Sequence, residues 1–178
     1  MISDIDPVLA ANLHHTRCHP SNWDDQVFTM TKGNLLSYRT YTCAIPGEVG
    51  GRPQPMPFMF VNPSLEQVML HSTGSGWEIS TVSHFRDCGL TGLNLTKPAP
   101  GTHASLRPGG VVHVQLEVSM EGWQFGTTPE ILALIRQLRG VALGATTAYL
   151  PDQQFTTLAG FAEAMQSGDL ALGWVQLL

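Results

Sequence analysis

The C-terminal third of the chain has the clearest repeat of apolar and polar positions. In residues 127–139 the apolar side chains recur with the helical period, Thr127 and Glu130 have the spacing of a capping box, and Gly140 follows as a natural end. Arg136 and Arg139 suit the negative end of the helix dipole. The pattern therefore predicts a helix over residues 127–139.

A strand, a second helix and a final strand are predicted after this helix. Residues 143–150 favour a strand, and Pro151 ends it. Residues 154–167 then carry apolar side chains at helical spacing, and Gly168 stops that helix. If strands 143–150 and 170–178 pair directly, the helix between them is a right-handed crossover between parallel neighbours. The sequence does not require them to pair.

The final strand, residues 170–178, is apolar on both faces, which predicts that both faces are covered. Two arrangements satisfy this pattern. Either the strand is central in its sheet, or one face contacts a second copy of the chain. Trp174, Val175 and Leu177 are the interface candidates in the second case.

Period-two alternation is strictest in residues 112–120, where valine, leucine and methionine alternate with polar residues that include His113, Gln115 and Glu117. Shorter runs predict further strands at residues 26–32, 35–45, 58–61, 67–72 and 77–85. The first two are expected to form a hairpin. Asp6 and Pro7 favour a short N-terminal helix that ends near residues 14–16.

Two segments rich in proline and glycine, residues 46–57 and 96–110, are predicted to be loops, because proline disfavours helices and central strands. The first is a candidate for the rim of a site or a partner contact, and a tolerated hairpin insertion explains it equally well. Together the elements predict one α+β domain over residues 1–178. Its expected form is a curved, mostly antiparallel sheet, a roll or half-barrel, packed against two C-terminal helices, with the short N-terminal helix.

The amino-acid composition limits the kinds of partner and the location that are expected. Charged residues are only 13% of the chain, so copies repel one another weakly, and a homo-oligomer is expected; a monomer with an uncharged polar surface is the alternative. The net charge of −5, without a basic cluster, argues against nucleic acid. The sequence contains neither a signal peptide nor an apolar run long enough for a membrane span, which predicts a cytoplasmic protein without a membrane partner. The odd number of cysteines, three, fits reduced thiols.

The densest group of metal-ligand residue types is His15, Cys18 and His19 with their neighbours. Imidazole and thiolate can bind zinc, but a Cys-x-x-Cys pair and a second pair at finger spacing are missing. No metal is favoured, and a polar loop after a frayed helix is the simpler interpretation.

A second group can line a pocket. His113, Gln115 and Glu117 share one strand face, and His84 is expected on the neighbouring strand, so the four can border one cavity. Solvent-exposed strand residues are the competing interpretation. His84, Asp87 and Cys88 also lie close in sequence, but adjacency does not create a catalytic triad, whose members meet from separate elements.

No phosphate-binding loop, dinucleotide fingerprint or nucleophile elbow occurs, so no cofactor is expected and no motif assigns an activity. Two hypotheses follow. The first is an oligomeric, non-enzymatic accessory or binding protein that recognises a small apolar ligand or a protein partner. The alternative is a small hydrolase or isomerase that uses a His/Glu pocket on the concave sheet face.

Overall fold

The computed structural model describes residues 8–12, 40–63, 67–117, 121–147 and 158–178, and within these ranges the fold is mixed α+β with open sheets. The central sheet consists, in spatial order, of β2 (Thr40–Val49), β3 (Arg52–Val61), β10 (Gly140–Thr146), β11 (Leu170–Gln176) and β6 (Thr91–Gly92). A second sheet consists of β7 (Thr102–Arg107), β8 (Val111–Leu116) and β9 (Glu121–Gly126). A third consists of β1 (Val8–Asn12), β4 (Gln67–Ser72) and β5 (Trp77–Ile79). The helices in the same ranges are α1 (Thr81–Asp87), α2 (Pro129–Leu138) and α3 (Leu158–Ser167).

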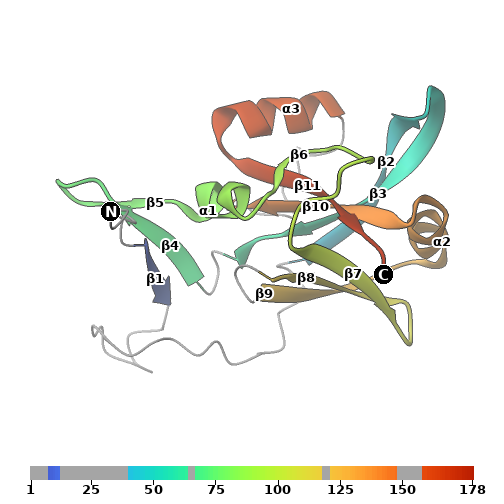
Figure 1. Cartoon of the computed structure of the whole chain (residues 1–178), viewed down its shortest axis with the longest axis horizontal. Coiled ribbons are helices and arrows are strands. Elements are labelled where there is room, and N and C mark those ends of the chain that lie inside the picture. Colours follow the sequence, from blue (N-terminus) through green and yellow to red (C-terminus); the bar gives the residue numbers. More distant parts are fainter. Residues whose placement is uncertain (1–7, 13–39, 64–66, 118–120, 148–157) are drawn as a thin grey trace.

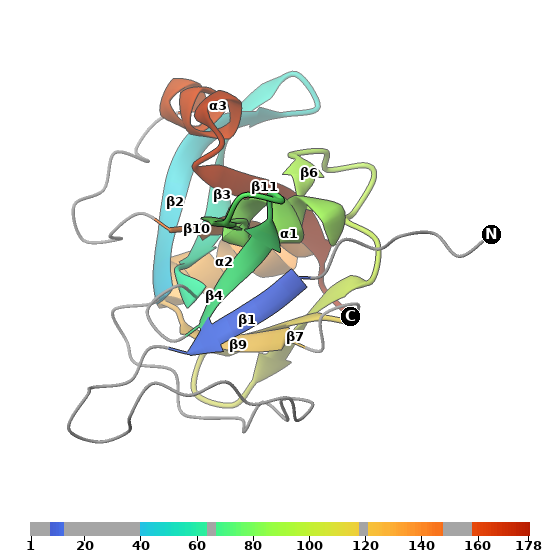
Figure 2. The same ribbon diagram turned by 90° about the vertical axis from the view of Figure 1, so that its left-hand side faces the viewer.

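The central sheet lies between two covering layers. Helix α3 covers one face, where Phe161 stacks on Phe58 and Phe60 with ring centroids 4.8 and 5.6 Å away. The β7–β8–β9 sheet covers the other face together with α1 and α2, and Figure 1 shows the layers from the side. Figure 2 shows them end on, with α3 above and β7 and β9 below. Strand β10 is buried at every position because both of its faces pack against apolar layers.

The last strand, β11, is a central strand, as one of its two predicted arrangements requires. It pairs with β10 on one side and with β6 on the other, and residues 170–175 are buried. Trp174 and Val175 are therefore covered within the chain and are not available for contact with another copy. Leu177 packs partly against the core, and its N–H donates to the carbonyl of Arg139 at 2.9 Å.

The two last strands are adjacent, but they run antiparallel, so α3 is not the predicted crossover between parallel neighbours. Thr146, at the end of β10, faces Leu170, at the start of β11. The connection that contains α3 therefore leaves and re-enters the sheet at the same end of these two strands. Arg86 of α1 fixes this return, because its guanidinium donates to the carbonyls of Met165 and Leu170.

The predicted loop over residues 46–57 is wrong: these residues form the hairpin of β2 and β3. The strands pair along their whole length, and Gly50 and Gly51, both with positive φ, make the turn. Three prolines on β3 alternate along the strand: Pro53, Pro55 and Pro57. Since proline has no N–H, they occupy positions whose N–H would face away from β2. In this segment that side is open, because β10 pairs with β3 only from Phe58 onward.

Two further predictions are wrong near the N-terminal half. Residues 8–12 form strand β1 rather than a helix, and β1 pairs antiparallel with β4. A helix of one or two turns is marginal on its own, so a neighbouring strand edge can override it. The predicted strand over residues 77–85 ends at Ile79, and α1 follows. Strand β4 lies where the sequence predicts it, at residues 67–72.

The predicted loop over residues 96–110 contains β7, which pairs with β8 and places Ala104 opposite Val114. The prolines and glycines lie in the turns on either side of β7, so they do not interrupt it. Strand β8 has the predicted alternation, with Val112, Val114 and Leu116 buried. Strand β9 was not predicted. Ala104 also forms a parallel bridge with Leu177, which links this sheet to the central one.

Helix α2 confirms the helix that the apolar pattern of residues 127–139 predicts, but its two ends differ from the prediction. The cap is Thr128, whose hydroxyl accepts from the Ile131 N–H at 3.4 Å, while Thr127 donates to the Gly110 carbonyl. The left-handed residue at the other end is Arg139, with φ of 54°, rather than Gly140. Gly140 is needed for packing, because a Cβ there would lie 2.6 Å from the Trp174 ring.

Several predictions lie outside the described residues. These are the strand at residues 26–32, the first part of the strand at residues 35–45, the end of the strand at residues 112–120, the end of the strand at residues 143–150, and the start of the helix at residues 154–167. Within the described part, Tyr41, Cys43 and Ile45 form the more buried face of β2, and Ala44 is exposed.

Candidate functional site

His113 and Gln115 lie on β8 on the face that points away from the core. Their neighbours in sequence, Val112, Val114 and Leu116, are buried, so the period of two turns the polar side chains outward. The strand register places Ser105 and Gln124 on either side of His113, and His103 opposite Gln115. This outer face is therefore polar.

Glu117 follows β8 and extends the same face. Its Oε1 lies 3.7 Å from Nδ1 of His103, and the side chains of Glu117 and His103 are 66% and 25% exposed. An exposed pair of this kind has little strength, because water screens it. The pair brings a carboxylate and an imidazole together, but His103 is not a residue that the sequence analysis selected.

His84 lies on α1, not on a strand beside β8. Its Nε2 is 3.7 Å from Sγ of Cys88, one helical turn away. Burial lowers the pKa of His84 below its usual value, and the negative charge of Asp87 partly opposes this shift. The lowered pKa favours the neutral imidazole. Cys88 itself is buried among core residues, which is typical of a structural thiol and unfavourable for an attacking thiolate.

The two candidate histidines are on opposite sides of the β7–β8–β9 sheet. Phe85, next to His84, packs on the ring of Trp123 at 5.6 Å, and both side chains belong to the core beneath that sheet. His113 points away from the core, from the opposite face of that sheet. The structure thus brings His113, Gln115 and Glu117 onto one surface, and it does not bring His84 to them.

The metal candidates His15, Cys18 and His19 lie outside the described residues. Within the described ranges, histidine, cysteine, aspartate and glutamate do not gather in any group of three or more that can hold a metal ion.

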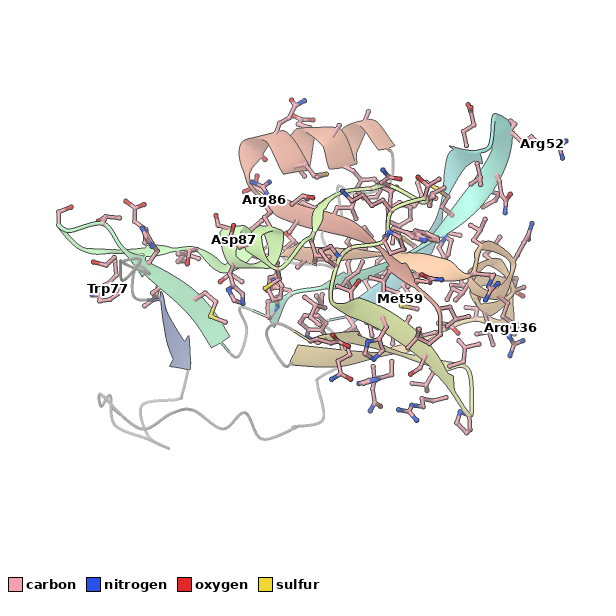
Figure 3. All side chains as sticks on the ribbon, viewed as in Figure 1. Arg52, Met59, Trp77, Arg86, Asp87 and Arg136 are labelled. Atoms are coloured by element: carbon pink, nitrogen blue, oxygen red, sulfur yellow. The ribbon has the colours of Figure 1, made fainter. Side chains whose placement is uncertain are left out.

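A different surface stands out on β5. The large hydrophobic residues with the greatest exposure in the described ranges are Trp77 at 45%, Ile79 at 68% and Leu178 at 83%. The first two lie on β5 and, being two residues apart, share one face. Figure 3 shows Trp77 on the hairpin of β4 and β5, which extends from the body of the molecule, far from Met59 in the core. We call this hairpin the arm. We call Trp77, Glu78 and Ile79 the β5 surface.

The backbone of β5 has a free side. Strand β4 pairs with β5, and in the described part of the chain no strand pairs with its other edge. At the two ends of the ladder, the Thr73 N–H donates to the Gly76 carbonyl and the Ser80 N–H donates to the Met69 carbonyl. Hydrogen-bonded and non-hydrogen-bonded pairs alternate in an antiparallel ladder. Glu78 is therefore bonded to β4, and the N–H and C=O groups of Trp77 and Ile79 point to the free edge.

Helix α1 anchors this arm to the body. The Met69 N–H donates to Oγ1 of Thr81 at 3.1 Å, next to the bond from Ser80, and Thr81 is buried. These bonds join the end of the hairpin to the first turn of α1, and Phe85 of α1 is embedded in the core. The arm is thus held at its base, while its tip and β5 are exposed.

Comparisons of this chain with protein-family models, with curated proteins and with solved structures found no match. None of the helices in the described ranges is long and apolar enough to cross a membrane. The site therefore has to be interpreted from its own geometry.

Proposed function

We propose that this chain is a non-enzymatic accessory protein that binds another protein through the β5 surface. The observation that carries the proposal is the exposure of Trp77 and Ile79 on one face of a strand whose outer edge pairs with no strand of the described residues. Tryptophan is enriched among the residues that dominate binding energies, and an exposed apolar edge strand is otherwise a risk of aggregation. A small apolar ligand has less support, because these side chains project from an arm instead of lining a cavity.

The enzymatic alternative has weaker support from the positions of its residues. A general acid and a general base must reach the same substrate. His113 and Glu117 lie on an outer sheet face, and His84 lies beneath that sheet. The pair of His103 and Glu117 is exposed to water, which reduces the electrostatic effects that a catalytic site uses.

Two parts of the sequence prediction belong to this proposal. The first is the single curved roll, which is supported by the bridge between Ala104 and Leu177 and by the donation of the Leu178 N–H to the Ala104 carbonyl. The second is action in the reducing cytoplasm, with which the absence of a disulfide at Cys43 and Cys88 is consistent.

Selection of peptides from a displayed random library tests the proposal. Peptides selected on the wild-type protein are titrated against the double variant Trp77→Ser/Ile79→Ser and against a matched control, Gln124→Ser, on the outer face of β9. We expect the double variant to lose at least about tenfold in affinity, and the control to bind like wild type. Circular dichroism confirms that each variant is folded. Equal binding to all three proteins, or no selected peptide, contradicts the proposal.

A further inference from the structure

We infer that the β5 surface recognises its partner by strand addition, and that the partner supplies an extended segment with the pattern apolar, basic, apolar. This inference rests on the proposed function and specifies how that surface binds. It follows from three features of β5: its free backbone groups, the face shared by its apolar side chains, and the charge between them.

The backbone sets the register of the incoming strand. Trp77 and Ile79 each present an N–H and a C=O at the free edge, since the bonds at Thr73 and Ser80 fix the alternation along the ladder. An antiparallel strand can pair with both residues at once and leave Glu78 in a non-hydrogen-bonded pair. The four bonds then add a fourth strand to the β1–β4–β5 sheet.

The side chains set the pattern of the incoming segment. Residues that pair with Trp77 and Ile79 lie on the same face as those side chains, so apolar residues there bury both. The residue between them faces Glu78 in a non-hydrogen-bonded pair, where opposite side chains are closest. Glu78 is exposed and carries a negative charge, so lysine or arginine is favoured opposite it.

The same charge disfavours a second copy of this chain as the occupant. Two β5 strands that pair about a twofold axis at Glu78 place the two Glu78 side chains directly opposite each other, and like charges in this position are destabilising. The net charge of −5 acts in the same direction. The homo-oligomer expected from the low charge content is therefore not formed through β5.

The test uses a disulfide-closed hairpin peptide whose outer strand is Thr-Val-Lys-Val-Thr, because a preformed strand loses less entropy on binding. Amide hydrogen exchange of the full chain is followed by NMR with and without the peptide. We expect exchange to slow at the Trp77 and Ile79 amides and to stay unchanged at Glu78, whose amide is already bonded to β4. Slowing at Glu78 alone, or equally along β4 and β5, overturns the assigned register.

Two matched changes separate backbone pairing from side-chain contact. N-methylation of the outward-facing amides of the peptide strand removes donors without changing its side chains, and we expect it to weaken binding about tenfold or more. Replacement of the peptide lysine by glutamate should weaken binding about fivefold. In the protein, Ile79→Pro removes one outward N–H that β4 does not use, together with the isoleucine side chain. Ile79→Ala loses the side chain but keeps the N–H and is the matched control, and Ile79→Val controls for substitution at this position.

The outcomes distinguish this inference from the proposed function. If selected peptides require Trp77 and Ile79, but N-methylation has no effect and Ile79→Pro binds no more weakly than Ile79→Ala, strand addition is wrong and the binding surface stands. If peptides bind without Trp77 and Ile79, both are wrong. Sedimentation that shows a wild-type dimer, lost in Ile79→Pro and kept in Ile79→Val, assigns β5 to a second copy and overturns the partner proposed here.

Discussion

Gly144 of β10 is a position where a single methyl group should be costly. Its neighbours across the ladders are Phe60 of β3 and Leu172 of β11. A Cβ on Gly144 would lie 2.5 and 2.6 Å from two ring carbons of Phe60, whereas carbon atoms in contact are about 3.5–4.0 Å apart. The ring is enclosed by the core, so it cannot move aside without displacing Phe161.

We expect Gly144→Ala to lower the free energy of unfolding. Overpacking of a core costs about 1–3 kcal/mol, and the reduced freedom of alanine in the unfolded chain returns about 0.4–1 kcal/mol, so the net loss can reach about 2.6 kcal/mol. The approach to within 2.5 Å of the Phe60 ring places Gly144→Ala in the upper part of this range. Urea denaturation measures this change. Gly126→Ala is the matched control, because a Cβ at Gly126 meets no atom within 4 Å, and it should be neutral or slightly stabilising.

A double-mutant cycle with Phe60→Leu tests the cause. If the ring of Phe60 is the obstacle, the smaller leucine relieves part of the overlap, and the double variant should be more stable than the sum of the single changes by at least about 0.5 kcal/mol. Additive effects would refute this explanation. A Gly144→Ala protein as stable as Gly126→Ala would refute the close packing of β3 and β10 at this point.

Three further predictions concern side chains away from β5. Arg86→Met should lower the free energy of unfolding by about 1.5–3 kcal/mol, because it removes the charged donor to the Met165 and Leu170 carbonyls. Thermal denaturation checks this: the melting temperature of Arg86→Lys should lie between those of wild type and Arg86→Met, and an unchanged melting temperature in Arg86→Met contradicts the prediction. Burial raises the pKa of the Cys43 thiol from 9.0 to about 11, so the contribution of this thiol to the free energy of unfolding should be complete below pH 9 and lost as the pH rises to 11. Site-resolved alkylation of Cys43 should be slow at pH 8, and rapid labelling in the native protein would show that the thiol is not buried. Burial lowers the pKa of His84 from 6.5, so its contribution to the free energy of unfolding should be complete above pH 6.5 and decrease as the pH falls. Denaturation measured across this pH range should show a smaller decrease in the free energy of unfolding for His84→Gln than for wild type, and an identical decrease would exclude His84 as the cause.

The elements that the sequence predicts correctly depend on local signals. Helix α2 has both an apolar stripe and a capping residue, and β8 alternates without interruption. Helix α1 was missed because Thr81 and Val82 are β-branched and follow a strand, although Thr81 and Phe85 are buried at helical spacing. The sequence does not predict the hairpin of β2 and β3, because proline disfavours central strands. Only the pairing register of β3 with β2 shows that the positions where Pro53, Pro55 and Pro57 lack an N–H face away from β2.

The candidate pocket could be predicted in part. Alternation along β8 places His113 and Gln115 on one face, and this depends on nothing beyond the strand itself. The position of His84 depends on which layer covers which face of the sheet. That arrangement is set by packing between segments far apart in sequence, such as Phe85 against Trp123. A single sequence contains no local signal for it.

The β5 surface shows the same limit for a binding site. In sequence, Trp77 and Ile79 alternate with Glu78 as in any strand, and alternation tells which side chains share a face but not whether another layer covers that face. The exposure arises because no layer of the described residues covers this face, and β5 is at the edge of its sheet in the same residues; both are properties of the whole fold. The turn at residues 73–76 is visible in the sequence, but the start of α1 at Thr81, which makes β5 very short, is known only from the structure. Because so short a strand buries little of its own apolar surface within the chain, the exposure of Trp77 is the observation on which the proposed partner depends.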